Sequence, residues 1–215
     1  KTNILLTAAR LFIEQGYEKT GMRQIAEEAG VRLSLTNYHF GSKKELGIRL
    51  IRGHIRAQEP YVVEFVGGYR DQRLLASTWM RLNYTLMVQP KFYQFYVDTL
   101  LNDIYLEALN YASVEYDQQR SLSLDQMYWV LGDSYIPVSI ERAMVLCPFT
   151  PLLVQDVPDI IIKYFLYHLS DNRDTGKTPD WYAAKSREAV NAILAKYPHL
   201  YDTFFQIPRV LAEYI

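Results

Sequence analysis

The sequence predicts an all-α protein in which a small basic N-terminal unit, residues 1–50, precedes a larger acidic helical domain, residues 51–215. Apolar residues recur three and four positions apart along almost the whole chain, and no run alternates as a β-strand does. Charge also divides the chain, because residues 1–58 carry a net charge of +5 and residues 59–215 carry −6. This asymmetry indicates that only the N-terminal part meets a polyanion.

Three helices are expected to form the small N-terminal unit, and a fourth begins near its end and continues beyond residue 50. Gly16 and Gly30 are suited to ending the first two, because glycine adopts the backbone conformations that helix ends require. Ser42 and Glu45 have the spacing of a capping box at the start of the fourth helix, and Pro60 is expected to end or kink that helix. The expected ranges are 3–15, 20–28 with Thr20 as the N-cap, 33–40 and 42–60.

The remaining chain predicts further helices separated by glycine and proline. Gly132 and Pro137 are expected to interrupt the chain, Pro158 is well placed in the first turn of a helix, and Thr178 is a candidate N-cap. The expected ranges are 71–88, 91–111, 113–131, 133–146, a helix from about 156, and 178–196. Residues 178–215 exceed what a simple helical bundle needs, and their role stays open.

Composition predicts a soluble cytoplasmic protein without catalytic or metal chemistry. Cys147 is the single cysteine, so no internal disulfide forms, and we expect it to be a buried small hydrophobe. No apolar run approaches the roughly 20 residues that span a bilayer. The four histidines are isolated from one another, so no metal, cofactor or catalytic residue is expected.

The turn and the short third helix have the geometry that places a recognition helix in the major groove of DNA. Gly30 permits the backbone to reverse, and Phe40 anchors the third helix to the core. Arg and Asn side chains read guanine and adenine edges, while Tyr, Ser and Lys hold phosphate. An ordinary helical hairpin with a polar face is the alternative. The side chains not needed for packing are Arg32, Leu33, Ser34, Asn37 and Tyr38.

Residues 4–50 resemble the DNA-binding domain of the TetR family of bacterial transcriptional regulators. The resemblance is carried by AARLF with GYEKT, then IAEEAGV, then YHFGSKKEL, at matching spacings. It implies a homodimer that presents two recognition helices to a palindromic operator of double-stranded DNA. It also implies a C-terminal domain that binds a small effector and changes the separation of those helices.

Individual positions take their implied roles from this resemblance. Tyr38 and Lys43 match residues that contact the DNA backbone, and Ser42-Lys43 begins a helix whose N-terminus favours phosphate. The start of the second helix, Thr20 and Arg23, matches another backbone contact, and His39 is interpreted as structural. The variable base-reading positions are matched by Arg32, Leu33, Ser34 and Asn37. Two positions depart from the family: Gly21 replaces a common Ser or Thr, and Thr36 replaces an apolar core residue.

The C-terminal domain carries weaker signals for an effector and for a dimer interface. Polar groups within the largely apolar stretch 124–146 either are satisfied structurally or line an effector pocket, together with nearby aromatic residues. The 18 tyrosines either fill the core or line a ligand cavity or a subunit interface. If they line a cavity, they suit an apolar or aromatic effector, which remains unidentified. The candidate effector residues are Tyr128, Trp129, Asp133, Tyr135 and Arg142. The candidate dimer-interface residues, with 124–146 and 157–170 as the helices, are Ile161, Tyr164, Phe165 and His168.

Together these features predict a ligand-responsive DNA-binding transcriptional regulator rather than an enzyme. The expected mechanism is a repressor that binds its operator as a homodimer and is released by the effector. Two alternatives from other classes stay open. One is a helical enzyme that carries a helix-turn-helix, and the other is a protein-interaction module whose basic unit binds an acidic protein.

Overall fold

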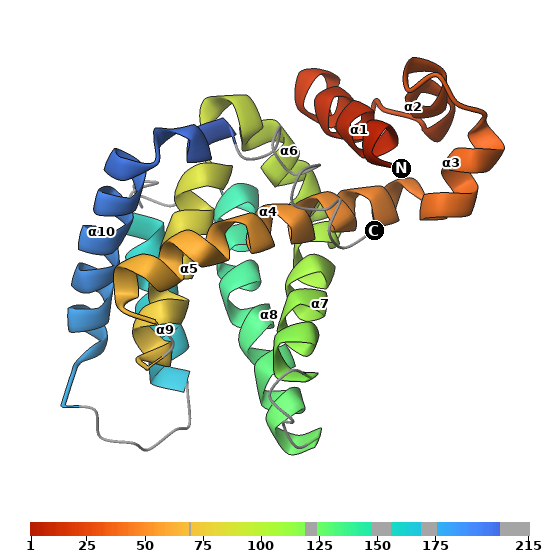
Figure 1. Ribbon diagram of the computed structural model, residues 1–215. Helices are drawn as coiled ribbons and strands as arrows, with labels where there is room; N and C mark the ends of the chain where they lie inside the picture. Colours follow the sequence, from red (N-terminus) through yellow and green to blue (C-terminus); the bar gives the residue numbers. More distant parts are fainter. Residues whose placement is uncertain (69, 119–123, 148–155, 169–175, 203–215) are drawn as a thin grey trace. The chain divides into compact units, whose positions relative to one another are not determined.

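The computed structural model describes residues 1–68, 70–118, 124–147, 156–168 and 176–202, with side chains except at 112–118, 124–134 and 168. The described residues form helices and no strand (Figure 1), which confirms the predicted all-α class. The helices are α1 (Thr2–Gln15), α2 (Met22–Glu28), α3 (Leu33–Phe40), α4 (Lys43–Val66), α5 (Gln72–Met87), α6 (Pro90–Leu101), α7 (Ile104–Gln118), α8 (Leu124–Leu146), α9 (Val157–His168) and α10 (Pro179–Lys196), followed by the 3-10 helix η2 (Pro198–Asp202).

The chain divides into two compact units. Unit 1 comprises residues 1–57 and 87–112 with the chain from 201, and unit 2 comprises residues 58–86 and 113–200. Unit 1 therefore contains α6 and the start of α7 in addition to the N-terminal helices. The division of the chain into domains 1–50 and 51–215 stays a prediction.

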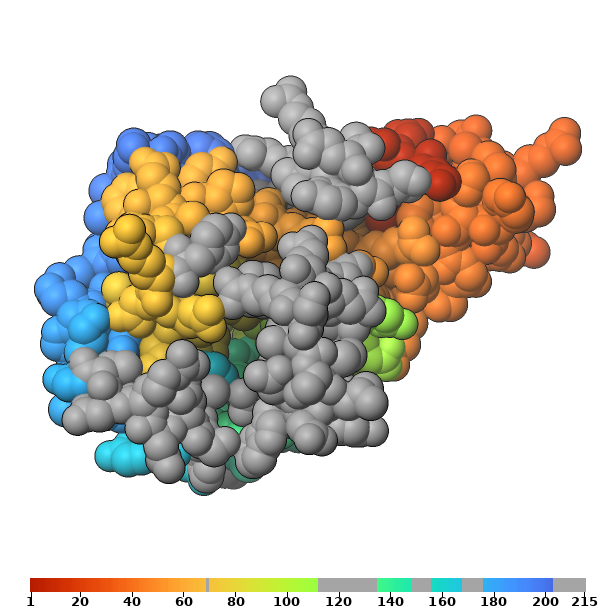
Figure 2. All heavy atoms as spheres, turned by 60° about the horizontal axis from the view of Figure 1, so that its bottom comes forward, coloured from red at the N-terminus to blue at the C-terminus, as the bar shows by residue number. Residues whose placement is uncertain are grey.

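Aromatic side chains form the centre of unit 1. Phe12 of α1 and Phe95 of α6 are both fully buried, and their rings stack with centroids 5.6 Å apart. Phe40 closes the end of α3 against the same unit, and Leu46 and Leu50 on α4 are also buried. In the space-filling view, red and orange atoms of the N-terminal residues lie together on the face shown (Figure 2).

Glycine ends the first three helices of unit 1. Gly16 follows α1 with a φ of 94°, and Gly30 and Gly41 follow the next two helices with a φ of 68° each. These left-handed conformations suit glycine because it has no Cβ. The predicted end points of α1 and α2 are confirmed, and α3 has the predicted range.

Two details of unit 1 differ from the prediction. The N-cap of α2 is Gly21 rather than Thr20, because the Thr20 hydroxyl donates a hydrogen bond to the Gly16 carbonyl instead (2.8 Å). The predicted helix 91–111 is two helices. They are separated at Asn102 and Asp103, and Asp103 has a φ of 57°. Asn and Asp tolerate this conformation better than most residues, so a helix break needs neither glycine nor proline.

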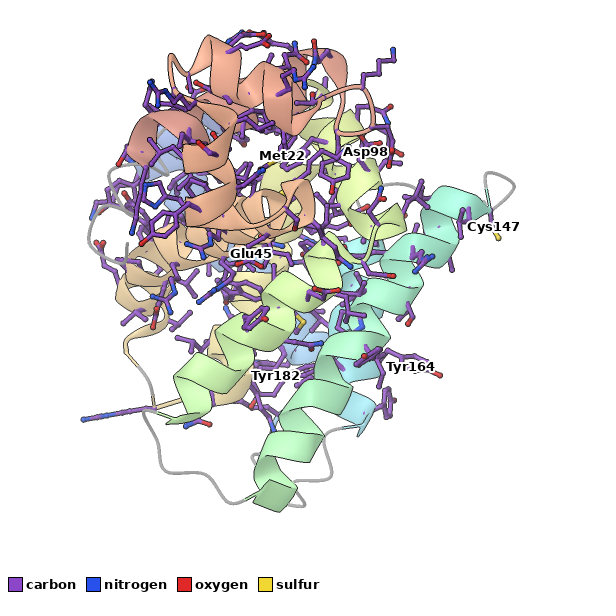
Figure 3. The ribbon with its side chains drawn as sticks, turned by 90° about the vertical axis from the view of Figure 1, so that its right-hand side faces the viewer. Met22, Glu45, Asp98, Cys147, Tyr164 and Tyr182 are labelled. Atoms are coloured by element: carbon purple, nitrogen blue, oxygen red, sulfur yellow. The ribbon has the colours of Figure 1, made fainter. Side chains whose placement is uncertain are left out.

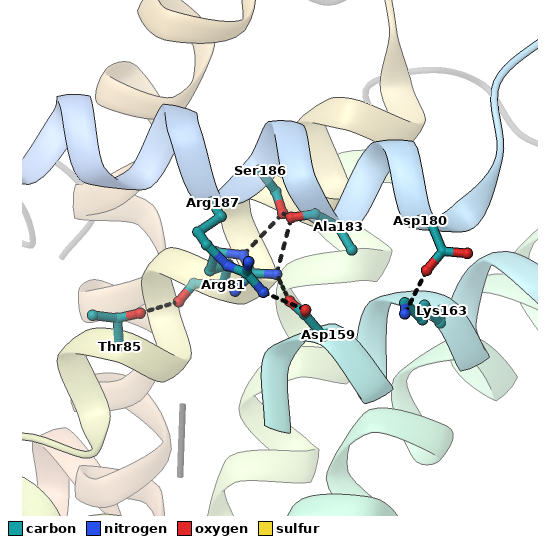
Figure 4. Close-up of polar contacts among 8 residues, drawn as sticks. All are labelled: Arg81, Thr85, Asp159, Lys163, Asp180, Ala183, Ser186 and Arg187. Carbon is teal, nitrogen blue, oxygen red and sulfur yellow. Dashed lines mark hydrogen bonds and ion pairs between the residues drawn. The ribbon is translucent and has the colours of Figure 1, made fainter. Parts of the chain in front are cut away.

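Unit 2 is held together by an apolar cluster and by one buried arginine. Ile162 and Leu166 of α9 pack against Tyr182 and Ala183 of α10. Arg81 on α5 is only 4% exposed. Its guanidinium donates to the Ser186 hydroxyl (2.9 Å), to the Ala183 carbonyl (3.1 Å) and to the Asp159 carboxylate (Figure 4). Arg81 thus joins three helices by satisfied polar contacts, as burial of a charge requires.

The expectation that Pro60 ends α4 is wrong, and so are the interruptions that were expected in α8. Pro60 lies inside α4, and Gly132 and Pro137 lie inside α8. A proline removes one backbone hydrogen bond, but packing of the next turn sustains a helix through it, and Val62 is buried on that turn. The predicted start of α10 is confirmed, because the Thr178 hydroxyl accepts a hydrogen bond from the Trp181 amide (3.2 Å).

Candidate nucleic-acid interface

Helix α3 has one buried side and one exposed side. Thr36 and Phe40 are the buried residues of the helix. Tyr38 is 82% exposed, and Leu35 is 43% exposed. Arg32, Ser34 and Asn37 are exposed as well, whereas Leu33 is half-buried. Of the predicted base-reading residues, the structure therefore brings three together on the exposed side and places Leu33 at its edge.

The packing of α2 against α1 positions this surface. Ile25 and Ala26 of α2 are buried, and the Val31 amide donates to the Ala26 carbonyl (2.9 Å) as the chain turns into α3. The Asn3 side-chain amide donates to the Ala29 carbonyl (2.8 Å), which ties the start of α1 to the end of α2. The turn is therefore braced on both sides by hydrogen bonds, so α3 leaves α2 in a defined direction.

The predicted phosphate contacts near α2 differ in availability. Arg23 is exposed in the first turn of α2, and Gly21 is exposed immediately before it. Thr20 is buried, and its hydroxyl also accepts a hydrogen bond from the Gln15 side chain (3.0 Å). The Thr20 hydroxyl is therefore used within the protein, whereas the Arg23 side chain is exposed at this point of the surface.

The Ser42 cap predicted at the start of α4 is present, but the reciprocal contact of a capping box is not, because the Ser42 amide donates to the Phe40 carbonyl (2.7 Å). The Ser42 hydroxyl accepts a hydrogen bond from the Glu45 amide (3.1 Å). The Glu45 carboxylate accepts from the Arg49 side chain (3.1 Å), a contact that the capping-box pattern alone does not predict. Ser42 is exposed, and the free amides of a helix N-terminus favour an anion.

Lys43 is bound to the turn between α1 and α2. Its ammonium donates to the Tyr17 carbonyl (2.9 Å) and lies 4.1 Å from the centroid of the Tyr17 ring. Burial raises the pKa of Tyr17 to about 12, so this ring stays a neutral phenol at physiological pH. The position that matches a backbone-contacting lysine thus holds a lysine whose charge also braces α4 against the α1–α2 turn.

Asp98 of α6 binds the same turn through the backbone amide of Tyr17. Its carboxylate accepts hydrogen bonds from the Tyr17 amide (2.8 Å) and from the Gln94 side chain (2.9 Å). Asp98 is buried and lies on α6 (Figure 3). Sequence reasoning missed this residue because its partner is 81 positions away along the chain, and no local pattern signals that pairing.

Leu35 is an exposed residue of α3 that sequence reasoning did not name as a candidate contact. It is 43% exposed, whereas the adjacent Thr36 is fully buried. Burial of Thr36 is what the resemblance implies for a position that usually holds an apolar core residue. A leucine beside that position on the same short helix was the available signal for an apolar group on the exposed side.

The residues predicted for an effector site and a dimer interface lie in unit 2, and they differ in how far their side chains are exposed. Tyr135 is exposed and Arg142 is half-buried on α8, while the side chains of Tyr128, Trp129 and Asp133 lie outside the described residues. On α9, Tyr164 is exposed and projects outward (Figure 3), Phe165 is half-buried, and the side chain of His168 is outside the described residues. Ile161 is buried within the unit rather than at its surface.

Three further observations concern groups that were expected to be absent or buried. The part of the chain that the structure describes contains no group of three or more His, Cys, Asp or Glu side chains placed to hold a metal ion. Within the same residues, no helix is both long and apolar enough to cross a membrane. The expected burial of Cys147 is wrong, because this thiol is exposed with Leu146 at the end of α8.

Comparison with known proteins identifies the N-terminal segment. Residues 4–50 match the family described as bacterial regulatory proteins, tetR family. A stretch of 52 residues is 36% identical to the HTH-type transcriptional activator FasR of Mycolicibacterium smegmatis, and it covers 24% of this chain and 24% of FasR. The chain thus matches about a quarter of the length of that curated relative.

Two solved structures match most of this chain at low sequence identity. A gamma-butyrolactone receptor (ArpA like protein) is 15% identical with a TM-score of 0.41, covering 89% of this chain and 96% of its own. Mycobacterium smegmatis AmtR is 16% identical with a TM-score of 0.37, covering 87% and 92% respectively.

The segment that matches this family comprises α1 to α3 and the first turns of α4. The likeness to bacterial regulatory proteins of the tetR family is therefore shown for residues 4–50.

Proposed function

We propose that the whole chain is a transcriptional regulator of the TetR family that binds a palindromic DNA operator as a homodimer, represses transcription there, and is released by a small-molecule effector. The exposed side of α3 carries the proposal. Arg32, Ser34, Asn37 and Tyr38 lie on it, and the opposite side of the helix is buried in unit 1. These are residue types that read base edges and phosphates in the major groove.

The contacts divide into two kinds. Arg32, Ser34 and Asn37 are proposed to face base edges, with Leu33 at the margin. Tyr38, Arg23 and Ser42 are proposed to contact phosphates, since all three are exposed. Thr20 and Lys43 are proposed to support these contacts from within, because their polar groups bind the Gly16 and Tyr17 carbonyls in this structure.

Exposed apolar side chains on α8 and α9 support a homodimer. Tyr135 and Leu146 are exposed on α8, and Tyr164 and Tyr167 are exposed on α9. Large exposed apolar side chains on adjacent helices are typical of a protein interface. We propose that these helices pair across a two-fold axis, with Phe165 at the edge and with Ile161 supporting the surface from inside. A role for His168 in this pairing stays a prediction.

An effector site in the second unit is supported by residue types alone. Tyr135 and Arg142 are the described members of the predicted set, and they combine aromatic surface with a cation. An apolar or aromatic effector that also carries a polar group fits this combination. Tyr128, Trp129 and Asp133 complete the proposed set.

Selection of binding sites from a random duplex pool with the full chain tests the proposal. The expected consensus is palindromic, and sedimentation of the complex should give two chains per duplex. Affinity should fall steeply with salt, because phosphate contacts release counterions. In a transcription assay with the selected site placed over a promoter, addition of the protein should lower transcript; a rise instead identifies an activator.

Variants of α3 test the interface itself. Asn37→Ala should relax base preference and weaken binding by about 1–3 kcal/mol at its own base pair. Tyr38→Ala should weaken binding evenly across sequences. Tyr93→Ala is the matched control, since Tyr93 is an exposed tyrosine on α6 of the same unit. Wild-type affinity and preference in the Asn37→Ala, Tyr38→Ala double variant would contradict this interface.

The effector is tested by release from the selected duplex. A panel of planar aromatic and aliphatic compounds is screened for a rise in melting temperature and for dissociation of the protein from DNA. A compound that does both should lose its effect in Arg142→Ala or Tyr135→Ala. Release that persists in both variants places the effector elsewhere.

A further inference from the structure

On α3 the apolar Leu35 is exposed, whereas the polar Thr36 next to it is buried. Leu35 exposes 43% of its surface, whereas Thr36 is fully buried and its hydroxyl has no hydrogen-bond partner within the described residues. Each placement opposes stability, because the leucine leaves apolar surface in water and the threonine buries an unpaired polar group. The opposite order of these two residues would give the helix an ordinary amphipathic pattern.

The location of Leu35 distinguishes it from other exposed leucines. Single apolar side chains on a surface are common and need no explanation. Leu35, however, lies one helical turn from Arg32 on one side and from Tyr38 on the other, and both neighbours are exposed. It is therefore surrounded by the groups proposed to approach DNA, and docking of this side would bury it.

We propose that Leu35 is a specificity-determining residue that contacts the 5-methyl group of thymine in the major groove. The inference rests on the proposed binding of α3 to duplex DNA. The thymine methyl is the apolar group that a base pair presents in this groove. Leucine has no hydrogen-bonding group in its side chain, so it cannot read the donor and acceptor pattern that Arg32 and Asn37 suit. It reads the methyl group by removing apolar surface from water.

The test compares thymine with deoxyuridine, which pairs identically but lacks the methyl group. A duplex selected by the full wild-type chain is resynthesised with each thymine replaced in turn, and affinity is measured by fluorescence anisotropy. Wild type should bind about fourfold more weakly for each contacted methyl that is removed, the effect of losing one buried methyl group. Leu35→Ala should bind the thymine and uracil duplexes equally.

Leu101→Ala is the matched control, because Leu101 is a leucine of similar exposure (40%) on α6 of the same unit. This variant should keep the wild-type preference for thymine. Alanine is a good helix former, so Leu35→Ala should keep α3 intact, and Leu35→Met, which retains an apolar side chain, should restore part of the preference.

Two outcomes would overturn the inference while leaving the proposed function standing. In one, wild type binds its selected duplex but no replacement of thymine weakens it. In the other, Leu35→Ala still distinguishes thymine from uracil. Failure of wild type to select any sequence would instead remove the proposed function, and this inference with it.

Discussion

Replacing Thr36 by valine should stabilise the protein. Thr36 lies on the buried side of α3 and its side chain is fully buried, with a hydroxyl oxygen that has no hydrogen-bond partner within the described residues. Threonine and valine have nearly the same shape, and both are β-branched, so the rotamer preferences in the helix are similar. The substitution therefore exchanges one buried group, a hydroxyl for a methyl, without opening a cavity.

The magnitude follows from the two groups exchanged. A buried hydroxyl that lacks a partner costs about 1–3 kcal/mol of stability. Burial of one more methyl group adds about 0.8 kcal/mol to the stability of the folded state. Partial relief of the hydroxyl by small backbone movements lowers the sum, so Thr36→Val should raise the free energy of unfolding by about 1–2 kcal/mol.

Thr99→Val is the matched control. Thr99 is also a fully buried threonine in unit 1, but its hydroxyl donates to the Tyr96 carbonyl (2.7 Å). Loss of that hydrogen bond should lower stability by about 1 kcal/mol. Both variants replace a buried threonine hydroxyl by a methyl group, but only Thr99→Val loses a hydrogen bond.

Native-state hydrogen exchange of peptides spanning α3 is the assay, because it reports opening of this unit even if the rest of the chain unfolds separately. Exchange in α3 of Thr36→Val should slow by roughly 5- to 30-fold, which corresponds to 1–2 kcal/mol. Unchanged or faster exchange would refute the reasoning, since it would mean that the Thr36 hydroxyl has a favourable partner. Because the side chain lies on the buried side of the helix, DNA affinity should not change.

Three other predictions concern buried polar groups. Asp98→Ala should destabilise unit 1 by about 1–3 kcal/mol, because it leaves the Tyr17 amide without its acceptor; Asp98→Asn should recover most of this loss in urea unfolding. Arg81→Met should cost about 2–4 kcal/mol in the same assay, since it breaks the contacts that join α5, α9 and α10, and a neutral effect would contradict a stabilising role. Burial lowers the pKa of His54 to about 3, whereas the pKa of an unfolded histidine is about 6.5. Between these two values the unfolded chain binds a proton at His54 and the folded chain does not. Stability should therefore be complete above pH 6.5 and decrease below it, by about 2 kcal/mol from pH 7 to pH 5, and His54→Leu should remove this decrease.

The sequence predicted best those features that depend on neighbouring residues. The Ser42 and Thr178 caps are both present, because a cap needs only a side chain and an amide three residues ahead. Glycine positions located the ends of α1 and α2 for the same local reason. By contrast, Pro60 does not end α4 and no glycine or proline marks the break at Asp103. There the outcome depends on packing against distant residues, which no window of sequence contains.

In the candidate site too, features that depend on neighbouring residues were predicted and features that depend on distant contacts were not. Arg32, Asn37 and Tyr38 were predicted as surface residues of α3 and are exposed, because residue type and the helical period determine which way they face. Their role in binding DNA stays a prediction. The partners of Thr20 and Lys43 were not predictable, since each depends on where the α1–α2 turn folds back. Residue types at matching positions predict a surface, but they do not determine which polar groups the protein uses internally.

The α1–α2 turn shows why those internal contacts matter for the proposed regulation. The Tyr17 amide is bound by Asp98 of α6, and the Tyr17 carbonyl is bound by Lys43 of α4. One residue of the turn is thus held by two helices at once, through both of its backbone polar groups. A shift of α6 relative to α1 has to break the Asp98 contact or carry Tyr17 with it, since a buried amide without an acceptor costs about 1–3 kcal/mol. Because Lys43 is bound to the Tyr17 carbonyl, such a shift would also reach the first turn of α4, which is separated from the end of α3 by two residues.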